Sequence, residues 1–331
     1  MTLVVRDEAD ILDAQIAYHL NAGVDFVIAI DHRSVDGTSE ILESYARAGY
    51  LRLIRRDDAR IEQSEWVTDL ARLAATEHEA DWVINSDADE FWWPRARSLK
   101  EALDAVPAIY GVVYAPMCYF LPRRGSGPFY DVMTVRLLQG APINNPLSRY
   151  RPSVKAAHRA SQRVVVLRGN HEVEHGGRRL TSWCPLEMLH FPDRSPEQCA
   201  RKYANTVDAW PADGREPGAF VLAAQHAIER IGIDESFDHL AVTDDDLVAA
   251  TGDRALEHDT RLRDVLRRLR SPAGERFLRP DEVPAELEIA LPSVLDDTRH
   301  ALDVAALAEA DLIRINRNVD DLFRRVQRIG A

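Results

Sequence analysis

The chain has 331 residues, 46% of them hydrophobic and 29% charged, and its formal net charge is −13 at pH 7. This length allows one large domain or two moderate ones with a real core. The acidic balance and the lack of a basic run disfavour nucleic acid as a partner, and no apolar stretch of roughly 18 residues predicts a membrane span. The N-terminus shows no signal pattern, and Cys118, Cys184 and Cys199 are scattered without metal-ligand spacing. We therefore expect free thiols in a reducing cytoplasm.

The first third of the chain alternates short apolar runs with amphipathic stretches. The pattern predicts strands at 3–5, 24–30, 50–54 and 82–84, separated by helices over 11–20, 38–45 and 66–76. Thr38 or Ser39 is placed to cap the second helix. Strands and helices in alternation at this spacing predict an α/β fold, with a mainly parallel sheet flanked by helices. Ligands of such sheets bind beyond the carboxyl ends of the strands.

The fourth predicted strand leads into D-W-V-I-N-S-D-A-D-E-F-W-W-P at residues 81–94. Carboxylates at Asp87, Asp89 and Glu90 repel one another at the end of a buried strand unless a cation or water reaches them. Asp87 and Asp89 lie two residues apart, so in extended chain their side chains point to the same side. Oxygen ligands so arranged suit Mg²⁺ or Mn²⁺. The alternative is a solvated acidic loop without a function.

Polar clusters also follow the first two predicted strands, at 6–8 and 31–36. Three clusters at three strand ends favour a binding site over an inert loop. The chain has no G-x-G-x-x-G after the first strand and no G-x-x-x-x-G-K-[ST], so the usual phosphate-binding loops are missing. A nucleoside diphosphate bound here would need a metal ion to meet its charge.

Three segments together resemble family 2 glycosyltransferases of the GT-A fold, and more closely a bacterial subgroup of them. They are V-R-D-E-A-D at 5–10, I-D-H-R-S-V-D-G-T at 30–38 and D-A-D-E-F at 87–91. The resemblance, which covers roughly residues 1–205, implies a Rossmann-like GT-A domain. It also implies a Mn²⁺- or Mg²⁺-dependent transfer of a hexose or related sugar from a nucleoside-diphosphate sugar. His32 stands where asparagine or aspartate is commoner, which leaves the nucleobase open.

The resemblance implies roles for individual residues. Those expected to line the nucleoside pocket are Arg6, Glu8, Asp31 and Asp36. Asp87 is expected to face ribose or metal, and Asp89 to hold the metal against the diphosphate. Similar lysine, G-N-H and H-F-P-x-R-S segments occur in the subgroup. Positive charge for the leaving diphosphate would accordingly come from Lys155, Arg194 and Lys202.

A late histidine often completes the metal site of GT-A enzymes, and His171 and His190 are the candidates. Either could equally be a hydrogen-bonded core residue. An inverting transfer, which we expect here, also needs a carboxylate to take the acceptor proton. Glu172 and Asp193 are in the right region, and Glu172 is favoured because it follows a strand and a small-residue turn. The E-D pair usual in family 2 is absent, so the base and the stereochemical outcome stay open.

The character of the chain changes after residue 210. A polar linker at 211–217 precedes helical patterns around 221–230 and 244–270, a proline-rich connector at 272–292 and a long amphipathic pattern at 293–329. We therefore expect a catalytic domain at 1–210, a helical accessory region at 211–292 and a C-terminal helix at 293–331. That helix would form a homodimer or dock on its own domain, and Asn316 would fix its register in a dimer.

Two rival functions remain at this stage. A nucleotidyltransferase uses a similar sheet and paired aspartates, but it normally has a glycine-rich basic loop where this chain has Arg6-Asp7-Glu8. A non-catalytic scaffold of the same fold would be favoured by loss of Asp87 or Asp89, and both are present. The acceptor of a glycosyltransferase is not indicated, whether a small metabolite, a lipid-linked glycan or a polymer precursor.

Overall fold

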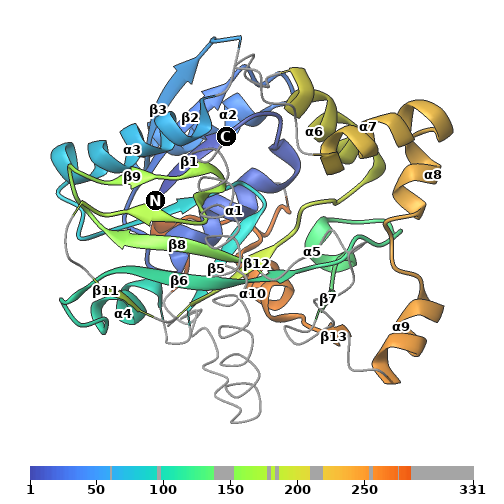
Figure 1. Ribbon diagram of the computed structural model, residues 1–331. Coiled ribbons are helices and arrows are strands. Elements are labelled where there is room, and N and C mark those ends of the chain that lie inside the picture. The colour runs from blue at the N-terminus through green and yellow to red at the C-terminus, as the bar shows by residue number, and fades with distance from the viewer. Residues whose placement is uncertain are drawn as a thin grey trace, which may run out of the picture.

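The computed structural model of the protein (Figure 1) describes residues 1–59, 62–94, 98–137, 153–176, 180–182, 186–208, 219–252, 256–274 and 276–284. The expected linker at 211–217 and the expected C-terminal helix at 293–331, with its dimer interface, lie outside these residues.

The strands are β1 (Thr2–Val5), β2 (Val27–His32), β3 (Leu51–Arg56), β4 (Trp82–Ser86), β5 (Glu90–Pro94), β6 (Tyr110–Tyr119), β7 (Val135–Leu137), β8 (Val154–Arg159), β9 (Val165–Val166), β10 (Val173–Glu174), β11 (Leu180–Ser182), β12 (Leu186–His190) and β13 (Leu256–His258). The α-helices are α1 (Ala9–Asn21), α2 (Thr38–Arg47), α3 (Gln63–Glu77), α4 (Leu99–Asp104), α5 (Phe129–Val132), α6 (Pro196–Asp208), α7 (Ala219–Ile231), α8 (Ile233–Asp238), α9 (Asp244–Gly252) and α10 (Arg261–Leu269). Two 3₁₀ turns are η1 (Arg168–Asn170) and η2 (Pro280–Glu282).

The main sheet has the strand order β3-β2-β1-β4-β8-β6-β12-β5, with β11 paired to β6. β3, β2, β1 and β4 are parallel to one another. β8 lies antiparallel between β4 and β6, β12 runs parallel to β6, and β5 closes the series antiparallel to β12. The predicted α/β fold with a mostly parallel sheet flanked by helices is confirmed (Figure 1).

The two faces of the sheet are visible in the alternation along β2. Val27 and Ala29 belong to a large core that also contains side chains of α1, α2 and α10. Ile28 and Ile30, which point the other way, pack in a second core with α3 and β9. Helices therefore cover both faces, and the carboxyl ends of β1, β2 and β4 are left at one edge.

The aromatic block after the acidic cluster is a strand, which the sequence pattern did not predict. β5 contains Trp92 and Trp93, both almost completely buried, and Pro94 is its last residue. The pairing that makes this segment a strand comes from β12, almost a hundred residues later in the chain. The helix cap expected from Thr38 or Ser39 is also different. Gly37 is the N-cap, and Asp36 accepts the Thr38 backbone N–H at 3.1 Å.

The long helix expected over 244–270 is two helices separated by β13, which pairs antiparallel with β7. The apolar face of α10, formed by Leu262, Val265, Leu266 and Leu269, belongs to the main core. A separate small core joins α6 to α7 and α8, with Cys199, Tyr203 and Phe237 at its centre. In the part of the chain that the structure describes, no helix has the length and apolar character needed to cross a membrane.

Candidate active site

The loops after β1 and β2 interlock at the sheet edge. Asp7 Oδ1 accepts the backbone N–H of Val35 at 2.7 Å, and the Glu8 N–H donates to Thr38 Oγ1 at 2.9 Å. Asp7 and Arg33 both have left-handed backbone conformations, with φ of 56° and 59°. Such conformations are costly for non-glycine residues and persist where surrounding contacts hold them. Two of the three predicted polar clusters are thus parts of one rigid rim.

The third cluster is the tight connection between β4 and β5. The Glu90 N–H donates to Asp87 O at 3.2 Å, and the Asp87 N–H donates to Glu90 Oε2 at 3.0 Å. Asp87 also accepts hydrogen bonds at 3.3 Å from Gln63 of α3 and from Asn170 of η1. Two neighbouring elements, α3 and η1, therefore hold the Asp87 carboxylate in place.

Lys155 of β8 forms ion pairs with two carboxylates of the β4–β5 connection. Its ammonium lies 2.8 Å from Asp87 Oδ2 and 2.6 Å from Glu90 Oε1, and only 3% of the side chain is exposed. Burial alone would lower the pKa of Lys155, but the two carboxylates raise it above its usual value. Lys155 was expected to contact the leaving diphosphate. Its position favours a different role, which is to hold Asp87 and Glu90.

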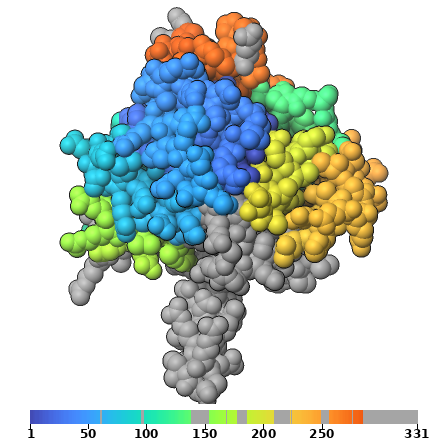
Figure 2. All heavy atoms as spheres, turned by 90° about the horizontal axis from the view of Figure 1, so that it is seen from above, coloured from blue at the N-terminus to red at the C-terminus, as the bar shows by residue number. Residues whose placement is uncertain are grey.

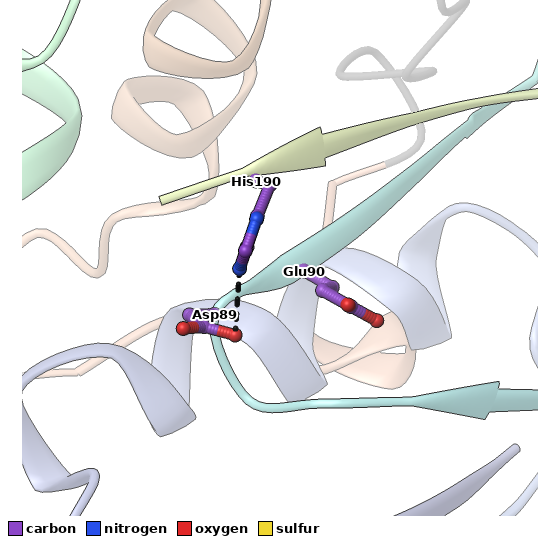
Figure 3. A group of neighbouring side chains, drawn as sticks. All are labelled: Asp89, Glu90 and His190. Carbon is purple, nitrogen blue, oxygen red and sulfur yellow. Dashed lines mark ion pairs between the residues drawn. The ribbon is translucent and has the colours of Figure 1, made fainter. Parts of the chain in front are cut away.

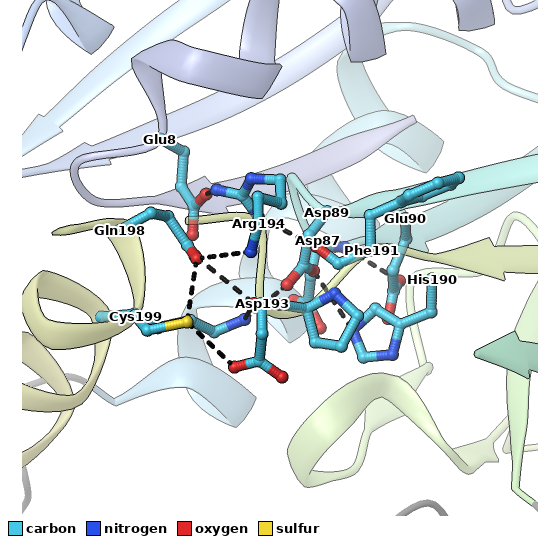
Figure 4. A network of polar contacts seen from close by, with 12 residues as sticks. Glu8, Asp87, Asp89, Glu90, His190, Phe191, Asp193, Arg194, Gln198 and Cys199 are labelled. Atoms are coloured by element: carbon cyan, nitrogen blue, oxygen red, sulfur yellow. Dashed lines mark hydrogen bonds and ion pairs between the residues drawn. The ribbon is translucent and has the colours of Figure 1, made fainter. Parts of the chain in front are cut away.

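Asp89 faces the opposite direction, toward β12 and α6 (Figure 4). Its Oδ2 lies 2.5 Å from the Lys202 ammonium, and its Oδ1 lies 3.5 Å from His190 Nε2. Burial would raise the pKa of Asp89, but Lys202 and His190 outweigh that effect and hold it well below its usual range. The sequence placed Asp89, His190 and Lys202 in one site, and the structure brings them together.

Arg194 fills the space between this group and the β1 loop (Figure 4). It forms ion pairs with Glu8 and Asp10, and it donates to Phe191 O at 3.0 Å. Only 2% of its side chain is exposed. Arg194 was expected to meet the diphosphate, but its described contacts tie the β12–α6 loop to the start of α1.

Glu90 is completely buried, and burial changes its pKa strongly. It raises the pKa of Glu90 to about 8, an effect that Asp87 and Asp89 reinforce and Lys155 opposes. Three carboxylates share two ammonium groups here, which favours proton uptake by the most buried of them.

A divalent cation could be held by Asp89, Glu90 and His190 (Figure 3). One potential ligand atom of each residue lies within 4.8 Å of the others. The Nδ1 of His190 is buried without a hydrogen-bond partner among the described residues. The Oε1 of Glu90 is paired with the Lys155 ammonium at 2.6 Å. Carboxylate oxygens with one imidazole suit Mg²⁺ or Mn²⁺, so these residues fit the expected ion. Asp87, the other expected aspartate ligand, is not part of this group.

The remaining predicted nucleotide-site residues line the rim. Arg6 donates to Asp208 at 3.0 Å, while its Nε and Nη1 are buried without a hydrogen-bond partner among the described residues. Asp31 is buried and accepts hydrogen bonds from Ser39 and Arg55. Asp36 accepts from the Ala9 N–H at 3.2 Å and from Thr38. Asp31 and Asp36 thus brace the loop, whereas Arg6 has hydrogen-bonding capacity left for a ligand.

His171, the other histidine candidate, lies apart from the acidic group. Its Nδ1 is 2.8 Å from Val154 O and 3.2 Å from Ser153 Oγ. Glu172 follows it, and its half-buried carboxylate makes no hydrogen bond or ion pair with a described residue. Asp193 is buried and accepts from the Tyr203 hydroxyl at 2.8 Å. The two candidate bases therefore differ sharply in their surroundings.

Three residues of the network were given no individual role from the sequence, although Glu90 was recognised as part of the acidic cluster. Asp10 holds Arg194, Asn170 holds Asp87, and Glu90 joins the candidate metal group. Asp10 and Asn170 stand inside segments that the resemblance singled out. Asn170 also has a left-handed backbone, with φ of 58°. Its neighbour Gly169 leaves no room for a side chain, because an added Cβ would lie 2.8 Å from the His171 ring.

Comparison with known proteins supports a glycosyltransferase origin for the N-terminal third. Residues 3–109 match the sequence profile of glycosyltransferase family 92. This segment contains β1 to β5 and the Asp87–Glu90 connection. The matching family is 92 rather than 2, so the finer resemblance to family 2 stays a prediction. No curated protein matches the chain significantly.

Similar solved structures include residues 1–349 of TarS from S. aureus. The TM-score is 0.36 at 12% identity, with 76% of this chain and 78% of that chain covered. The same TarS fragment in complex with UDP-GlcNAc gives a TM-score of 0.32 at 13% identity, covering 76% of this chain and 79% of that one. A likeness at these values carries no argument about the ligands of this chain.

Proposed function

We propose that the protein is a metal-dependent glycosyltransferase that moves a sugar from a nucleoside-diphosphate sugar to an acceptor hydroxyl. The observation that carries the proposal is the meeting of Asp89, Glu90 and His190 beside Lys202 at the carboxyl edge of the sheet. Ligands of open α/β sheets bind at this edge. The match of residues 3–109 to glycosyltransferase family 92, which includes two of these residues, supports the same reaction.

Asp89 and His190 would hold Mn²⁺ or Mg²⁺, with Glu90 completing the group. When bound, the ion would neutralise charge on the departing diphosphate. Lys202 is the lysine that can also meet the diphosphate, because 30% of its side chain is exposed whereas Lys155 is enclosed. Arg6 would add the two buried nitrogens that lack a partner among the described residues. Positive groups preorganised around a leaving diphosphate lower the barrier to its departure.

The acceptor proton would pass to Glu172 in an inverting transfer of a hexose or related sugar. This carboxylate is half-buried and makes no hydrogen bond or ion pair with a described residue. It stands two residues from Asn170, whose amide contacts Asp87 at 3.3 Å. A general base must be near the reacting hydroxyl and able to take its proton. The cytoplasmic location and the dimer through 293–331 remain parts of the proposal that come from sequence pattern alone.

Consumption of a donor tests the function. The purified chain is incubated with Mn²⁺, UDP-, GDP-, CDP- or dTDP-linked hexoses, and a heat-treated whole-cell extract that supplies small metabolites, lipid-linked glycans and polymers as acceptors. Release of the nucleoside diphosphate is followed by mass spectrometry. We expect turnover of one donor class, lost in Asp89→Asn and in samples treated with EDTA. The exposed Asp69→Asn on α3 is the matched control and should keep full turnover. The proposal fails if no donor is consumed or if Asp89→Asn is as active as the control.

A further inference from the structure

A cavity outside the candidate active site is lined by residues of α1 and α2. Its volume is about 470 Å³, which is within the roughly 300–1,000 Å³ typical of small-molecule sites. Its walls come from α1, α2, α5 with the preceding Pro128, and a C-terminal segment that contributes Arg270, Arg276, Phe277 and Arg279. Figure 2 shows this last segment as the orange surface beside the blue N-terminal helices and the green α5 region. None of the roles proposed above uses this cavity.

One wall of the cavity is aromatic. It contains Phe129, Tyr130 and Phe277, whose exposed fractions are 7%, 6% and 4%. The rings of Tyr130 and Phe277 meet edge to face, with centroids 6.0 Å apart. Because each ring is held by the core beneath it, the wall offers a rigid apolar surface to one face of a ligand.

Arg270 brings a positive charge to the same wall. Its guanidinium carbon lies 4.8 Å from the centre of the Phe277 ring. The other two arginines of the cavity are engaged. Arg276 binds Glu282 at 2.6 and 2.7 Å, and Arg279 donates to Ser44 Oγ at 2.6 Å. Arg270 makes no ion pair or hydrogen bond through its side chain with any residue that the structure describes. Its donors are therefore left for a ligand.

Tyr130 adds a neutral donor next to that charge. Tyr130 and Arg270 both line the cavity, and both contact Phe277, Tyr130 through ring centroids 6.0 Å apart and Arg270 through its guanidinium. Within the described ranges, the Tyr130 hydroxyl has no hydrogen-bond partner. A guanidinium and a hydroxyl that converge on a cavity are suited to one carboxylate or phosphate group.

The residues from α1 and α2 supply acceptors to the cavity. Asp10 and Asp13 line it but are already occupied, Asp10 by Arg194 and Asp13 by the Tyr45 hydroxyl and the Phe277 N–H. Glu40 lies at the rim, is exposed, and makes no ion pair with a described residue. It can accept hydrogen bonds from ligand hydroxyl groups. The cavity thus combines an anion-binding corner, an apolar wall and a free carboxylate.

We propose that this cavity binds an acidic sugar, with its carboxylate or phosphate on Arg270 and Tyr130, its ring face on Phe129 and Phe277, and a hydroxyl on Glu40. Such a ligand matches all three features at once, whereas a bare anion uses only the corner and a neutral sugar leaves the guanidinium unpaired. The site does not depend on the proposed transfer reaction, because its residues are separate from the metal and donor groups.

Isothermal titration of the full chain, without metal or nucleotide, tests the proposal. The probes are glucuronate, galacturonate, glucose 6-phosphate, glucose and inorganic phosphate. We expect at least one acidic sugar to bind with a Kd below about 1 mM, and glucose and phosphate to bind at least tenfold more weakly. Comparison of uronates with the sugar phosphate identifies which anion fits.

Arg270→Gln should weaken binding of the acidic sugar about ten- to a hundredfold, because it removes a charge-assisted hydrogen bond. Tyr130→Phe should weaken binding severalfold, because it removes a neutral hydrogen bond. Both changes keep the approximate size of the side chain. Arg268→Gln, on the exposed side of α10, is the matched control and should bind normally. The melting temperatures of all three variants establish that they are folded. The proposal is overturned if no acidic sugar binds, if glucose or phosphate binds as tightly, or if Arg270→Gln binds like Arg268→Gln.

Discussion

Lys202 of α6 places its ammonium 2.5 Å from Asp89 Oδ2, although more than a hundred residues separate them in the chain. Lys155 makes the corresponding contact with Asp87 at 2.8 Å from the other side. The two aspartates of the D-A-D motif therefore point to different lysines. One lysine is enclosed and the other is 30% exposed, which predicts different consequences when each is removed.

Lys155→Met should lower the free energy of unfolding by about 3–5 kcal/mol, because it leaves Asp87 and Glu90 without their buried counter-ion. Urea unfolding measures this loss. Lys202→Met should cost less stability but remove donor turnover. The double variant Lys155→Met/Glu90→Gln should regain part of the lost stability, since it removes one of the stranded carboxylates. Equal stability losses for the two lysines would contradict the different roles assigned to them.

Glu172→Gln should lower turnover by about 10²- to 10⁴-fold with donor binding unchanged, as expected when a general base is lost. Asp193→Asn is the matching test at the other candidate. Asp193 is buried and held by Tyr203 and Cys199, so we expect this change mainly to lower the melting temperature. Turnover and nucleotide binding of both variants decide between them. If Asp193→Asn loses turnover without losing stability while Glu172→Gln keeps normal turnover, then Asp193 and not Glu172 is the general base.

Two buried histidines predict a loss of stability in mild acid. Burial lowers the pKa of His19 to about 3 and that of His158 to about 4, from 6.5. Both are neutral in the folded state, whereas the unfolded chain takes up protons as the pH falls below 6.5. Stability should therefore fall between pH 6.5 and pH 4, by up to about 1.4 kcal/mol per pH unit for each histidine.

His158→Leu isolates one of these histidines. Between pH 6.5 and pH 4, the unfolding free energy of the variant should fall less steeply with pH than that of the natural chain. The difference in slope should correspond to one proton fewer taken up on unfolding. Urea unfolding at pH 7, 6 and 5 gives the comparison. Parallel pH curves for the two proteins would show that His158 does not titrate on unfolding in this range.

Leu266→Ala should destabilise the whole fold by about 2–5 kcal/mol, because Leu266 of α10 is completely buried in the main core. The exposed Arg268→Ala on the same helix should change stability by less than about 0.5 kcal/mol. A single cooperative urea transition, shifted only in Leu266→Ala, is the expected result. A variant that loses only a separate small transition would mean that α10 unfolds independently of the sheet.

The sequence predicted the part of the fold whose contacts are local. The alternation of apolar runs and helices located β1 to β4 and the helices between them to within a few residues. It did not reveal β5, because residues 90–94 become a strand through pairing with β12, which follows much later in the chain. The helix expected over 244–270 failed for the same reason, since β13 exists through its pairing with β7.

The candidate site shows the same division. The sequence placed Asp89, His190 and Lys202 in one site, and the structure brings these three side chains together. The sequence could not show which cations are enclosed. Lys155 and Arg194 have the right charge for a diphosphate, but burial and carboxylate partners give them other contacts. Side-chain type predicts chemistry, and only packing decides whether a ligand can reach it.

A thermal-shift panel of UDP, GDP, CDP and dTDP, each with and without Mn²⁺, tests the central claim most directly. A nucleotide at a hundred times its Kd should stabilise the protein by about 2.7 kcal/mol, which is a readily measured shift. The account predicts that one nucleotide stabilises the chain only when Mn²⁺ is present, and that Asp89→Asn loses this response while Asp69→Asn keeps it. A folded protein that responds to none of the four, or an Asp89→Asn variant that responds like the natural chain, would contradict a metal-bound nucleotide at this site.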